Sequence, residues 1–355
     1  MRNATLIYNP IAGRRPARRE REVRQAATVL ERAGIAIQLA ATTGPGVARH
    51  LAATAAKQGD ELVVVCGGDG TINEVVNALA FTTTRLAILP GGTANIIARE
   101  LGLPLNPVRA ARQLPRWLPR LVPLGLATWS LKTGVGSSES GIAEKPLKTG
   151  VGSGESGIAE KLRVGAPDLR SFFPDSRPPT PDSRLHEAHR YFLSVGGVGY
   201  DAHVVYKLTH DFKMFLGVAA YGLEALRQVT RYDFPLFVCR ANGCELQGTF
   251  AAIQRTSRYA GWFRMAPQAR FFEPRLALCL FQSRRWTSYF AYAGAVAGRL
   301  HPRLRDVEML ETAQVECSAV EPNTRILFEV DGELAGALPA TFGVAPDALT
   351  LLTPA

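Results

Sequence analysis

The sequence predicts an α/β N-terminal domain with a doubly wound, mostly parallel sheet, followed by an all-β sandwich domain. Two observations predict the order of these domains. Strand-like apolar runs alternate with helical patterns over residues 1–123, which is typical of a parallel sheet covered by helices on both faces. Short strand-like runs separated by turn residues then dominate residues 124–345, which is typical of an all-β domain.

The first domain is expected to contain four strands, each followed by a helix. The most apolar run, at residues 61–66, indicates a strand that is buried on both faces of the sheet. The other strands are expected at 4–10, 35–41 and 86–89, and the helices at 16–33, 46–58, 71–79 and 93–101.

The second domain is expected to contain one helix, at residues 216–230, among short strands. These strands are expected at 191–195, 236–239, 249–253, 276–281, 314–317 and 325–330. Residues 346–355, which include the apolar run 349–352, are expected to return to the first domain.

A low-complexity insert interrupts the second domain at residues 131–189. Residues 131–145 recur almost unchanged as 147–161, and a run rich in Pro, Ser and Asp follows at 166–184. Such a composition cannot bury a core, so we predict a disordered insertion. A surface insertion costs only about 0.6 kcal/mol for each doubling of its length.

The turn after the buried strand at 61–66 is the most informative part of the chain. It reads Gly67, Gly68, Asp69 and Gly70, and Thr71 is expected to cap the helix that follows. Glycines bring bare N–H groups against a ligand, and a helix N-terminus at the same place favours phosphate. Because the Asp69 carboxylate would repel that phosphate unless a cation or a hydroxyl lay between them, the loop predicts phosphoryl chemistry with a metal.

Two further strands end in similar turns. Gly91, Gly92 and Thr93 follow the strand at 86–89, and Asn9 ends the strand at 4–10. Because the carboxyl ends of parallel strands share one edge of a sheet, we expect these residues to form one polar rim that binds a ligand.

Composition and charge limit the classes of partner and the cellular location that we expect. The formal net charge is +10, and six arginines crowd the first helix: Arg14, Arg15, Arg18, Arg19, Arg21 and Arg24. They form either a solvated face or a surface that attracts nucleotide phosphate or anionic lipid. No aromatic residues are interleaved with them, so we expect no nucleic-acid partner. The apolar runs fall short of the roughly 20 residues that a membrane span needs, and the five scattered cysteines favour reduced thiols in a cytosolic protein.

An ordered set of motifs is similar to those of the diacylglycerol kinase catalytic-domain family, which includes soluble bacterial lipid kinases and sphingosine kinases and is related to NAD kinases. The motifs are Asn9-Pro10-x-Ala12-Gly13, Gly67 to Glu74, Pro90-x-Gly92-Thr93-x-Asn95, Gly197 to Ala202, Leu216 to Tyr221 and Val330 to Glu333. They span almost the whole chain. The sequence contains no Walker A motif, and Gly152 to Gly157 matches a dinucleotide-binding pattern by letter alone, because no strand precedes it.

The resemblance implies an ATP-dependent kinase with Mg²⁺ as its cofactor and an active site in the cleft between the domains. Glu333 would be the base, Asp69 would orient Mg²⁺ or help to activate the acceptor, and Asp331 would shape the turn. The residues expected to bind the nucleotide are Asn9, Pro10, Gly13, Thr43, Gly67, Gly68, Asp69, Gly70, Thr71, Asn73, Glu74, Gly92, Thr93 and Asn95.

The chain departs from the family pattern at a second metal position. Bacterial relatives commonly carry Asp-Gly after a Pro-x-Ala pattern, and their aspartate helps to bind a structural magnesium. Here Glu273 and Pro274 stand at that position. Glu273 is the substitute ligand that we consider, and Asp69 is the other candidate metal ligand.

Diacylglycerol is the default acceptor, with sphingoid bases, ceramide and phosphatidylglycerol left open. The alternatives are an NAD kinase-like phosphotransferase and a catalytically silent protein that binds nucleotide or membrane. The expected location is cytoplasmic with transient, peripheral membrane contact, and a homodimer is a further candidate assembly. Two segments that combine arginines with a tryptophan are candidate membrane contacts, Arg116 to Arg120 and Arg284 to Trp286.

Overall fold

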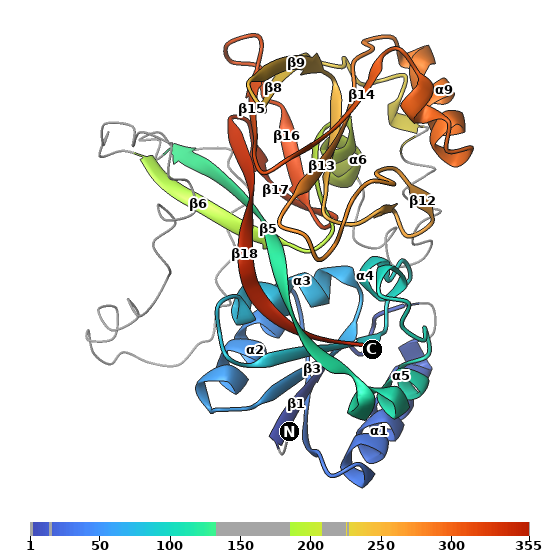
Figure 1. Ribbon diagram of the computed structural model, residues 1–355, viewed down its shortest axis with the longest axis vertical. Helices are drawn as coiled ribbons and strands as arrows, with labels where there is room; N and C mark the ends of the chain where they lie inside the picture. The colour runs from blue at the N-terminus through green and yellow to red at the C-terminus, as the bar shows by residue number, and fades with distance from the viewer. Residues whose placement is uncertain (1–2, 14–15, 133–184, 208–224, 226, 355) are drawn as a thin grey trace, which may run out of the picture. The chain divides into compact units, whose positions relative to one another are not determined.

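The computed structural model describes residues 3–13, 16–132, 185–207, 225 and 227–354. The chain divides into two compact units, residues 1–129 with 188–355 and residues 130–187, and the contacts described below lie within the first unit. The predicted fold class is confirmed: a mostly parallel α/β sheet is followed by antiparallel β-structure (Figure 1).

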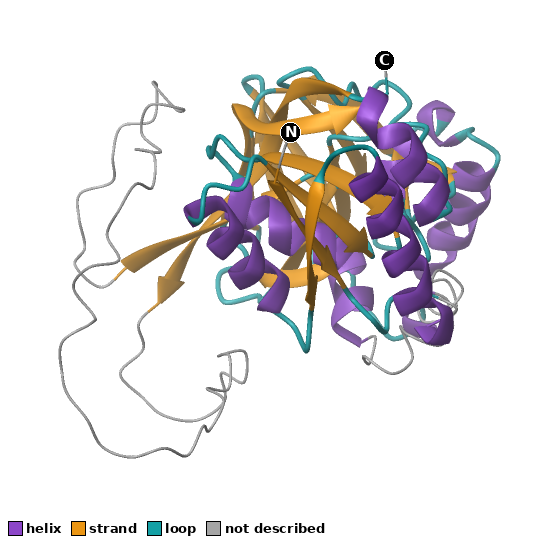
Figure 2. Cartoon of the chain, turned by 90° about the horizontal axis from the view of Figure 1, so that it is seen from below, coloured by secondary structure: helices purple, strands orange, loops and turns teal. Residues whose placement is uncertain are grey.

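The α/β part alternates strands and helices, and Figure 2 shows helices packed against its strands. Its strands are β1 (Asn3–Tyr8), β2 (Ala36–Ala41), β3 (Leu62–Gly67) and β4 (Arg85–Pro90), and its helices are α1 (Pro16–Arg32), α2 (Val47–Lys57), α3 (Asp69–Leu79), α4 (Ile96–Glu100) and α5 (Pro107–Gln113), followed by the short η1 (Leu114–Arg116). These strands lie in the order β2-β1-β3-β4, and each neighbouring pair is parallel.

The β-rich part contains the remaining strands, together with helical segments. The strands are β5 (Leu118–Lys132), β6 (Leu185–Phe192), β7 (Val195–Gly199), β8 (Phe237–Ala241), β9 (Cys244–Gly248), β10 (Phe250–Gln254), β11 (Arg258–Tyr259), β12 (Phe263–Arg264), β13 (Leu276–Phe281), β14 (Val307–Thr312), β15 (Val315–Ala319), β16 (Leu327–Val330), β17 (Glu333–Ala337) and β18 (Ala340–Thr353), and the helical segments are α6 (Tyr200–Lys207), α9 (Trp286–Ala297) and η3 (His301–Arg303).

The long strand β18 connects the two parts of the structure. Leu351, near its end, pairs in parallel with Leu86 of β4, while residues at its start pair antiparallel with β15 of the β-rich part. One sheet therefore continues from the parallel strands through β18, β15, β8 and β9, and a second sheet runs in the order β14-β13-β10-β7-β16-β17. A core of buried apolar side chains lies between them, with Phe192, Phe237, Phe328 and Phe342 among its members.

Hydrophobic burial explains why the α/β elements form where the sequence predicts them. All six residues of β3 are buried, as expected for a central parallel strand. Helix α3 buries Ile72, Val75, Val76 and Leu79, a spacing that places them on one face of a helix.

Three predicted element boundaries differ from those of the structure. Helix α3 begins at Asp69, two residues before the predicted start, and its N-cap is Gly68, so Thr71 is not the cap. Helix α4 begins at Ile96 because the Asn95 side chain accepts a hydrogen bond from the Gly92 amide and donates one to its carbonyl. The predicted strand 191–195 is broken between β6 and β7.

The β-rich part also contains helices that the sequence analysis missed, since only one was expected there. The expected helix at 216–230 lies largely outside the described residues, and so do residues 133–184 of the predicted insert. The two ends of that insert are strand, because β5 continues to Lys132 and β6 begins at Leu185.

Candidate active site

The three predicted loops lie side by side at the carboxyl edge of the parallel sheet. The Asn9 amide donates to the Cys66 carbonyl at 3.1 Å, and the Gly91 amide donates to the Gly67 carbonyl at 2.9 Å. A Cβ atom on Gly92 would lie 2.5 Å from the Gly68 Cα, so the two backbones approach too closely for a side chain at position 92. The expected polar rim is therefore one packed surface of backbone.

Arg19 of α1 holds two of these loops together. Its buried guanidinium donates to the Gly91 carbonyl at 2.6 Å and to the Ala12 carbonyl at 3.3 Å. The sequence analysis grouped this arginine with a solvated or phosphate-attracting surface. The structure assigns it a supporting role instead, because its donors point into the protein.

Asp69 lies at the first turn of α3 and reaches across to the neighbouring loop. Its Oδ1 accepts a hydrogen bond from the Ile96 amide at 2.8 Å. Burial is the main cause that raises the pKa of Asp69 to about 6; the hydrogen bond from the Ile96 amide opposes this shift, and the nearby negative charge of Asp331 adds to it. A cation beside this carboxylate would favour its ionised form.

Asp331 and Gly332 form a two-residue hairpin turn between β16 and β17. Both have positive φ, 50° and 82°, which is typical of the type I′ turn that Asp-Gly pairs favour. The Asp331 carboxylate accepts hydrogen bonds from the amides of residues 193, 194 and 195 at 2.9, 2.9 and 3.1 Å. These bonds account for the break between β6 and β7, because the amides of the connecting residues turn toward the carboxylate.

The same carboxylate ties the hairpin to α3. Asn73, which is 1% exposed, donates from Nδ2 to Asp331 at 2.8 Å and to the Tyr191 carbonyl at 2.9 Å. Burial raises the pKa of Asp331, and the hydrogen bonds it accepts oppose that shift. The hairpin therefore has a defined position over the start of α3.

This arrangement places Glu333 directly against the glycine loop. A Cβ atom on Gly70 would lie 2.7 Å from the Glu333 Oε1. The other carboxylate oxygen accepts a hydrogen bond from the guanidinium of Arg190, which also donates to the Asn73 Oδ1 at 3.0 Å. The sequence analysis missed Arg190 because it lies next to the predicted insert and in none of the motifs.

Other predicted nucleotide residues make contacts within the protein. Both oxygens of the Glu74 carboxylate accept hydrogen bonds at the start of α2, from the Gly46 amide at 2.9 Å and the Ala48 amide at 3.0 Å. The Asn9 side chain accepts from the Ile11 amide at 3.0 Å and so shapes its own loop. Thr43 is exposed just beyond β2, whereas Thr42 is buried.

Glu273 does not fit the role of a metal ligand. Its side chain is exposed, and its backbone carbonyl accepts a hydrogen bond from the fully buried Arg255. The same guanidinium donates to the carbonyls of Arg275 at 2.6 Å, Phe271 at 2.6 Å and Pro123 at 3.0 Å. Burial lowers the pKa of Arg255 to about 10, so it remains charged at neutral pH. A guanidinium already supplies the positive charge that these carbonyls face.

No group of three or more His, Cys, Asp or Glu side chains arranged to hold a metal occurs among the described residues. Asp69 is different from Glu273, because Mg²⁺ is commonly bound by one or two carboxylates together with substrate phosphates. The raised pKa of Asp69 and the nearby negative charge of Asp331 fit a cation that binds together with a nucleotide.

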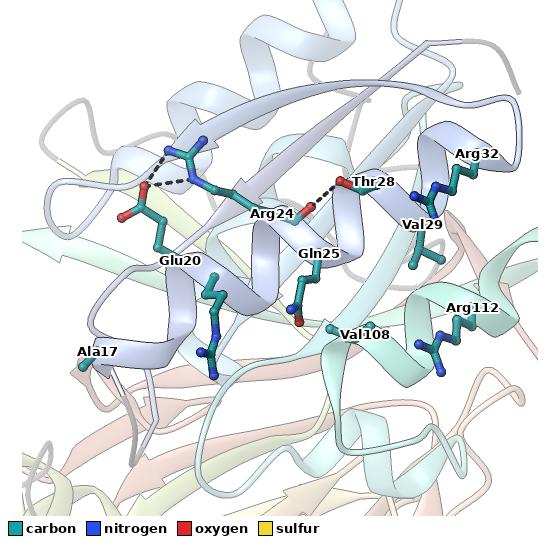
Figure 3. Close-up of a pocket in the computed structure, with 10 residues that line it drawn as sticks. Ala17, Glu20, Arg24, Gln25, Thr28, Val29, Arg32, Val108 and Arg112 are labelled. Carbon is teal, nitrogen blue, oxygen red and sulfur yellow. Dashed lines mark hydrogen bonds and ion pairs between the residues drawn. The ribbon is translucent and has the colours of Figure 1, made fainter.

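A pocket of about 730 Å³ lies elsewhere, between α1 and α5 (Figure 3). Arg21, Arg24, Arg32 and Arg112 are among its lining residues, and Arg24 donates to Glu20 at 2.6 Å. None of the predicted site residues lines it, so it is separate from the candidate active site.

The two candidate membrane contacts differ in exposure. Trp117 is 5% exposed, so its predicted interfacial role is wrong, whereas Trp286 is 48% exposed. None of the helices in the described residues is long and apolar enough to cross a bilayer.

Comparison with known proteins identifies the parts of the chain. Residues 3–126 match the diacylglycerol kinase catalytic domain, and residues 194–353 match the YegS C-terminal NAD kinase beta sandwich-like domain. The fold and site thus define a two-domain kinase class, in which a glycine-loop α/β domain is joined to a β-sandwich. The resemblance to the diacylglycerol kinase catalytic-domain family predicted from the motifs is confirmed, because the chain carries that catalytic domain followed by the β-sandwich-like domain.

Similar proteins share most of the length of the chain. It is 24% identical to a protein of Bacillus subtilis named diacylglycerol kinase, over 96% of this chain and 93% of that protein. A Staphylococcus carnosus protein of the same name is also 24% identical, over 96% and 92%. A crystal structure described as a diacylglycerol kinase from Bacillus anthracis has a TM-score of 0.68 and 19% identity, with coverage of 99% and 97%. This structural similarity shows that the chain has the same fold as that protein.

Proposed function

We propose that this protein is an ATP-dependent lipid kinase that transfers the γ-phosphoryl group of ATP to a lipid hydroxyl. The observation that carries the proposal is the position of Glu333, whose carboxylate lies against Gly70 in the first turn of α3, the residue that follows Asp69. A phosphate-binding loop and a carboxylate that is able to accept a proton therefore meet at one place.

In this proposal the backbone amides of the glycine loop and the N-terminal end of α3 bind the nucleotide phosphates. Asp69 would hold the Mg²⁺ that accompanies ATP, which neutralises charge on the phosphates when bound. Asn9, Thr43 and Thr93 would contribute side-chain hydrogen bonds around the nucleotide.

Glu333 would act as the general base. It takes the proton of the acceptor hydroxyl as that oxygen forms its bond to the γ-phosphorus and the bond to the bridging oxygen breaks, which releases ADP. Arg190 donates a hydrogen bond to this carboxylate and thereby positions it above Gly70. Asn73 and Asp331 support the arrangement, because they tie the hairpin to α3.

Diacylglycerol is the acceptor that we favour, since the similar proteins of Bacillus subtilis and Staphylococcus carnosus are named diacylglycerol kinase. The product would then be phosphatidic acid. The reaction would take place at a membrane surface to which the protein binds peripherally from the cytoplasm.

Transfer of radiolabelled phosphate from ATP and Mg²⁺ to a lipid panel and to NAD tests the proposal. The panel contains diacylglycerol, a sphingoid base, ceramide and phosphatidylglycerol. We expect label in one lipid, loss of that label in Glu333→Gln, and retention in the control Glu308→Gln, which changes an exposed carboxylate on β14.

Two outcomes would contradict the proposal. Label in NAD would identify an NAD kinase-like enzyme. Binding of ATP without transfer to any acceptor in the panel would favour a catalytically silent nucleotide-binding protein.

A further inference from the structure

Helix α9 exposes an aromatic face instead of a charged one. Its twelve residues include no Asp, Glu, Lys or Arg. Tyr289, Tyr292 and Val296 are buried, whereas Trp286 and Phe290, one turn apart, are 48% and 45% exposed. The exposed pair is in edge contact, with ring centroids 5.9 Å apart. An exposed helix face in water is normally polar.

A neighbouring hairpin extends this surface. The strands β11 and β12 form a short antiparallel pair, and β12 contacts α9, which lies next to it in Figure 1. Trp262 and Phe263, at the turn of this hairpin, are 64% and 38% exposed. We call these four side chains, Trp262, Phe263, Trp286 and Phe290, the aromatic face.

The charge around the aromatic face is mostly positive. Residues 258–306 contain nine arginines and two acidic residues, Glu273 and Asp306, and Asp306 accepts a hydrogen bond from the Tyr292 hydroxyl of α9. The exposed arginines adjoining the hairpin and α9 in the chain are Arg264, Arg284, Arg285 and Arg299. Exposed tryptophans with flanking arginines match an interface with an apolar interior and anionic headgroups. This complementarity favours an anionic bilayer over a protein partner.

The hairpin also rests on the candidate active site. A Cβ atom on Gly261 would lie 3.1–3.2 Å from atoms of Ala94, in the loop that carries Thr93 and Asn95. The Arg99 guanidinium lies 4.5 Å from the centroid of the Trp262 ring. The Ser257 amide and hydroxyl both donate to Glu100 of α4, at 3.1 and 3.0 Å. The aromatic face and the nucleotide loop are therefore joined by direct contacts.

We propose that the aromatic face and its arginines dock the protein onto an anionic lipid bilayer, and that the hairpin at 258–264 brings the bound surface next to the glycine loops. The inference that the bound bilayer supplies the lipid acceptor to the active site rests on the proposed lipid kinase function. The docking itself does not depend on it.

Sedimentation of the full chain with vesicles tests the docking. The vesicles are phosphatidylcholine alone, and phosphatidylcholine with phosphatidylglycerol. We expect at least tenfold tighter binding to the anionic vesicles, and about a tenfold loss in the double variant Trp286→Ser and Phe290→Ser. The control Leu39→Ser removes an exposed apolar side chain from β2, an edge strand of the sheet that contains the parallel strands, and should bind like the wild type.

Fluorescence and activity give independent readouts. Quenchers in the bilayer should reduce emission from Trp262 and Trp286 but not from the buried Trp117. With diacylglycerol in detergent micelles, the double variant should phosphorylate lipid as the wild type does, while its rate on anionic vesicles falls about tenfold. Because sedimentation and quenching need no turnover, an inactive protein that still binds vesicles would count against the kinase and not against the docking.

Three results would overturn the inference. The first is failure of the wild type to sediment with anionic vesicles at low salt, and the second is binding of the double variant as tight as that of the wild type. The third is a wild-type dimer, found by sedimentation velocity, that the double variant converts to a monomer, which would make the aromatic face a protein interface.

Discussion

Replacement of Gly70 by alanine should displace the Glu333 carboxylate without unfolding the protein. The added Cβ atom would lie 2.7 Å from Oε1, whereas ordinary van der Waals contact begins at 3.4 Å. The carboxylate must therefore withdraw by about 0.7 Å, the difference between these distances. It is able to do so because it is the end of a flexible side chain and is partly exposed.

Gly70→Ala should lower the activity of the protein but raise its stability. A misplacement of about 1 Å in an active site costs up to about 100-fold in rate, so we expect kcat to fall between about tenfold and 100-fold. That fall corresponds to roughly 1.4–2.8 kcal/mol of transition-state stabilisation. Because position 70 lies inside α3, alanine should raise the free energy of unfolding by about 0.5–1 kcal/mol.

Phosphoryl-transfer kinetics and denaturant unfolding of four proteins test this reasoning: the wild type, Gly70→Ala, Glu333→Gln and the double variant. If the methyl group acts through the carboxylate, Gly70→Ala should cause no further loss of kcat in the Glu333→Gln background. An equal loss in both backgrounds would refute the reasoning, because the methyl group would then act on the nucleotide loop. Gly294→Ala, in α9 with open space around the added Cβ, controls for the helix-stabilising effect of alanine.

Three further predictions follow from the polar contacts. Arg255→Met should lower the free energy of unfolding by about 3–5 kcal/mol, because four backbone carbonyls lose a charged donor, and Arg255→Lys should recover part of it in denaturant titrations. Equal stability of Arg255→Met and the wild type would contradict this. The pKa of Asp69 is raised from 3.8 to about 6 in the folded state, so its contribution to stability is present near pH 4 and is lost as the pH rises through 6. Unfolding curves of Asp69→Asn should show a smaller fall over that range, and an identical fall would show that other groups cause it. Glu74→Gln should cost about 1–2 kcal/mol of stability because it weakens the contacts at the start of α2, with the KM for ATP unchanged. A raised KM at unchanged stability would instead support a nucleotide contact.

Much of the α/β part could be predicted from local sequence. The run at β3 is apolar at every position, the glycine turn follows it, and α3 repeats its apolar residues with a helical spacing. These patterns involve residues that are neighbours along the chain, so period and turn chemistry are sufficient to predict them. The order of the motifs also predicted the family, because those loops are contiguous in sequence.

The contacts that build the candidate site depend on tertiary structure. Asn73 and Asp331 are 258 positions apart, and Arg190 and Glu333 are 143 apart. No local pattern shows which carboxylate a given donor will contact, so the sequence showed neither the two amides that donate to Glu74 nor the contact of Arg190 with Glu333. Arg255 resembles any other arginine in the sequence, and its role follows only from the four carbonyls that surround it.

The two arginine–tryptophan segments also show what local sequence predicts and what depends on tertiary structure. The sequence by itself determined that each joins a cation to an aromatic ring, which is chemistry suited to a membrane surface. Only the tertiary structure decided that Trp117 is buried and Trp286 exposed. The physical reason is that burial depends on which distant elements pack over a residue, whereas sequence spacing determines only the face of its own element on which the residue lies.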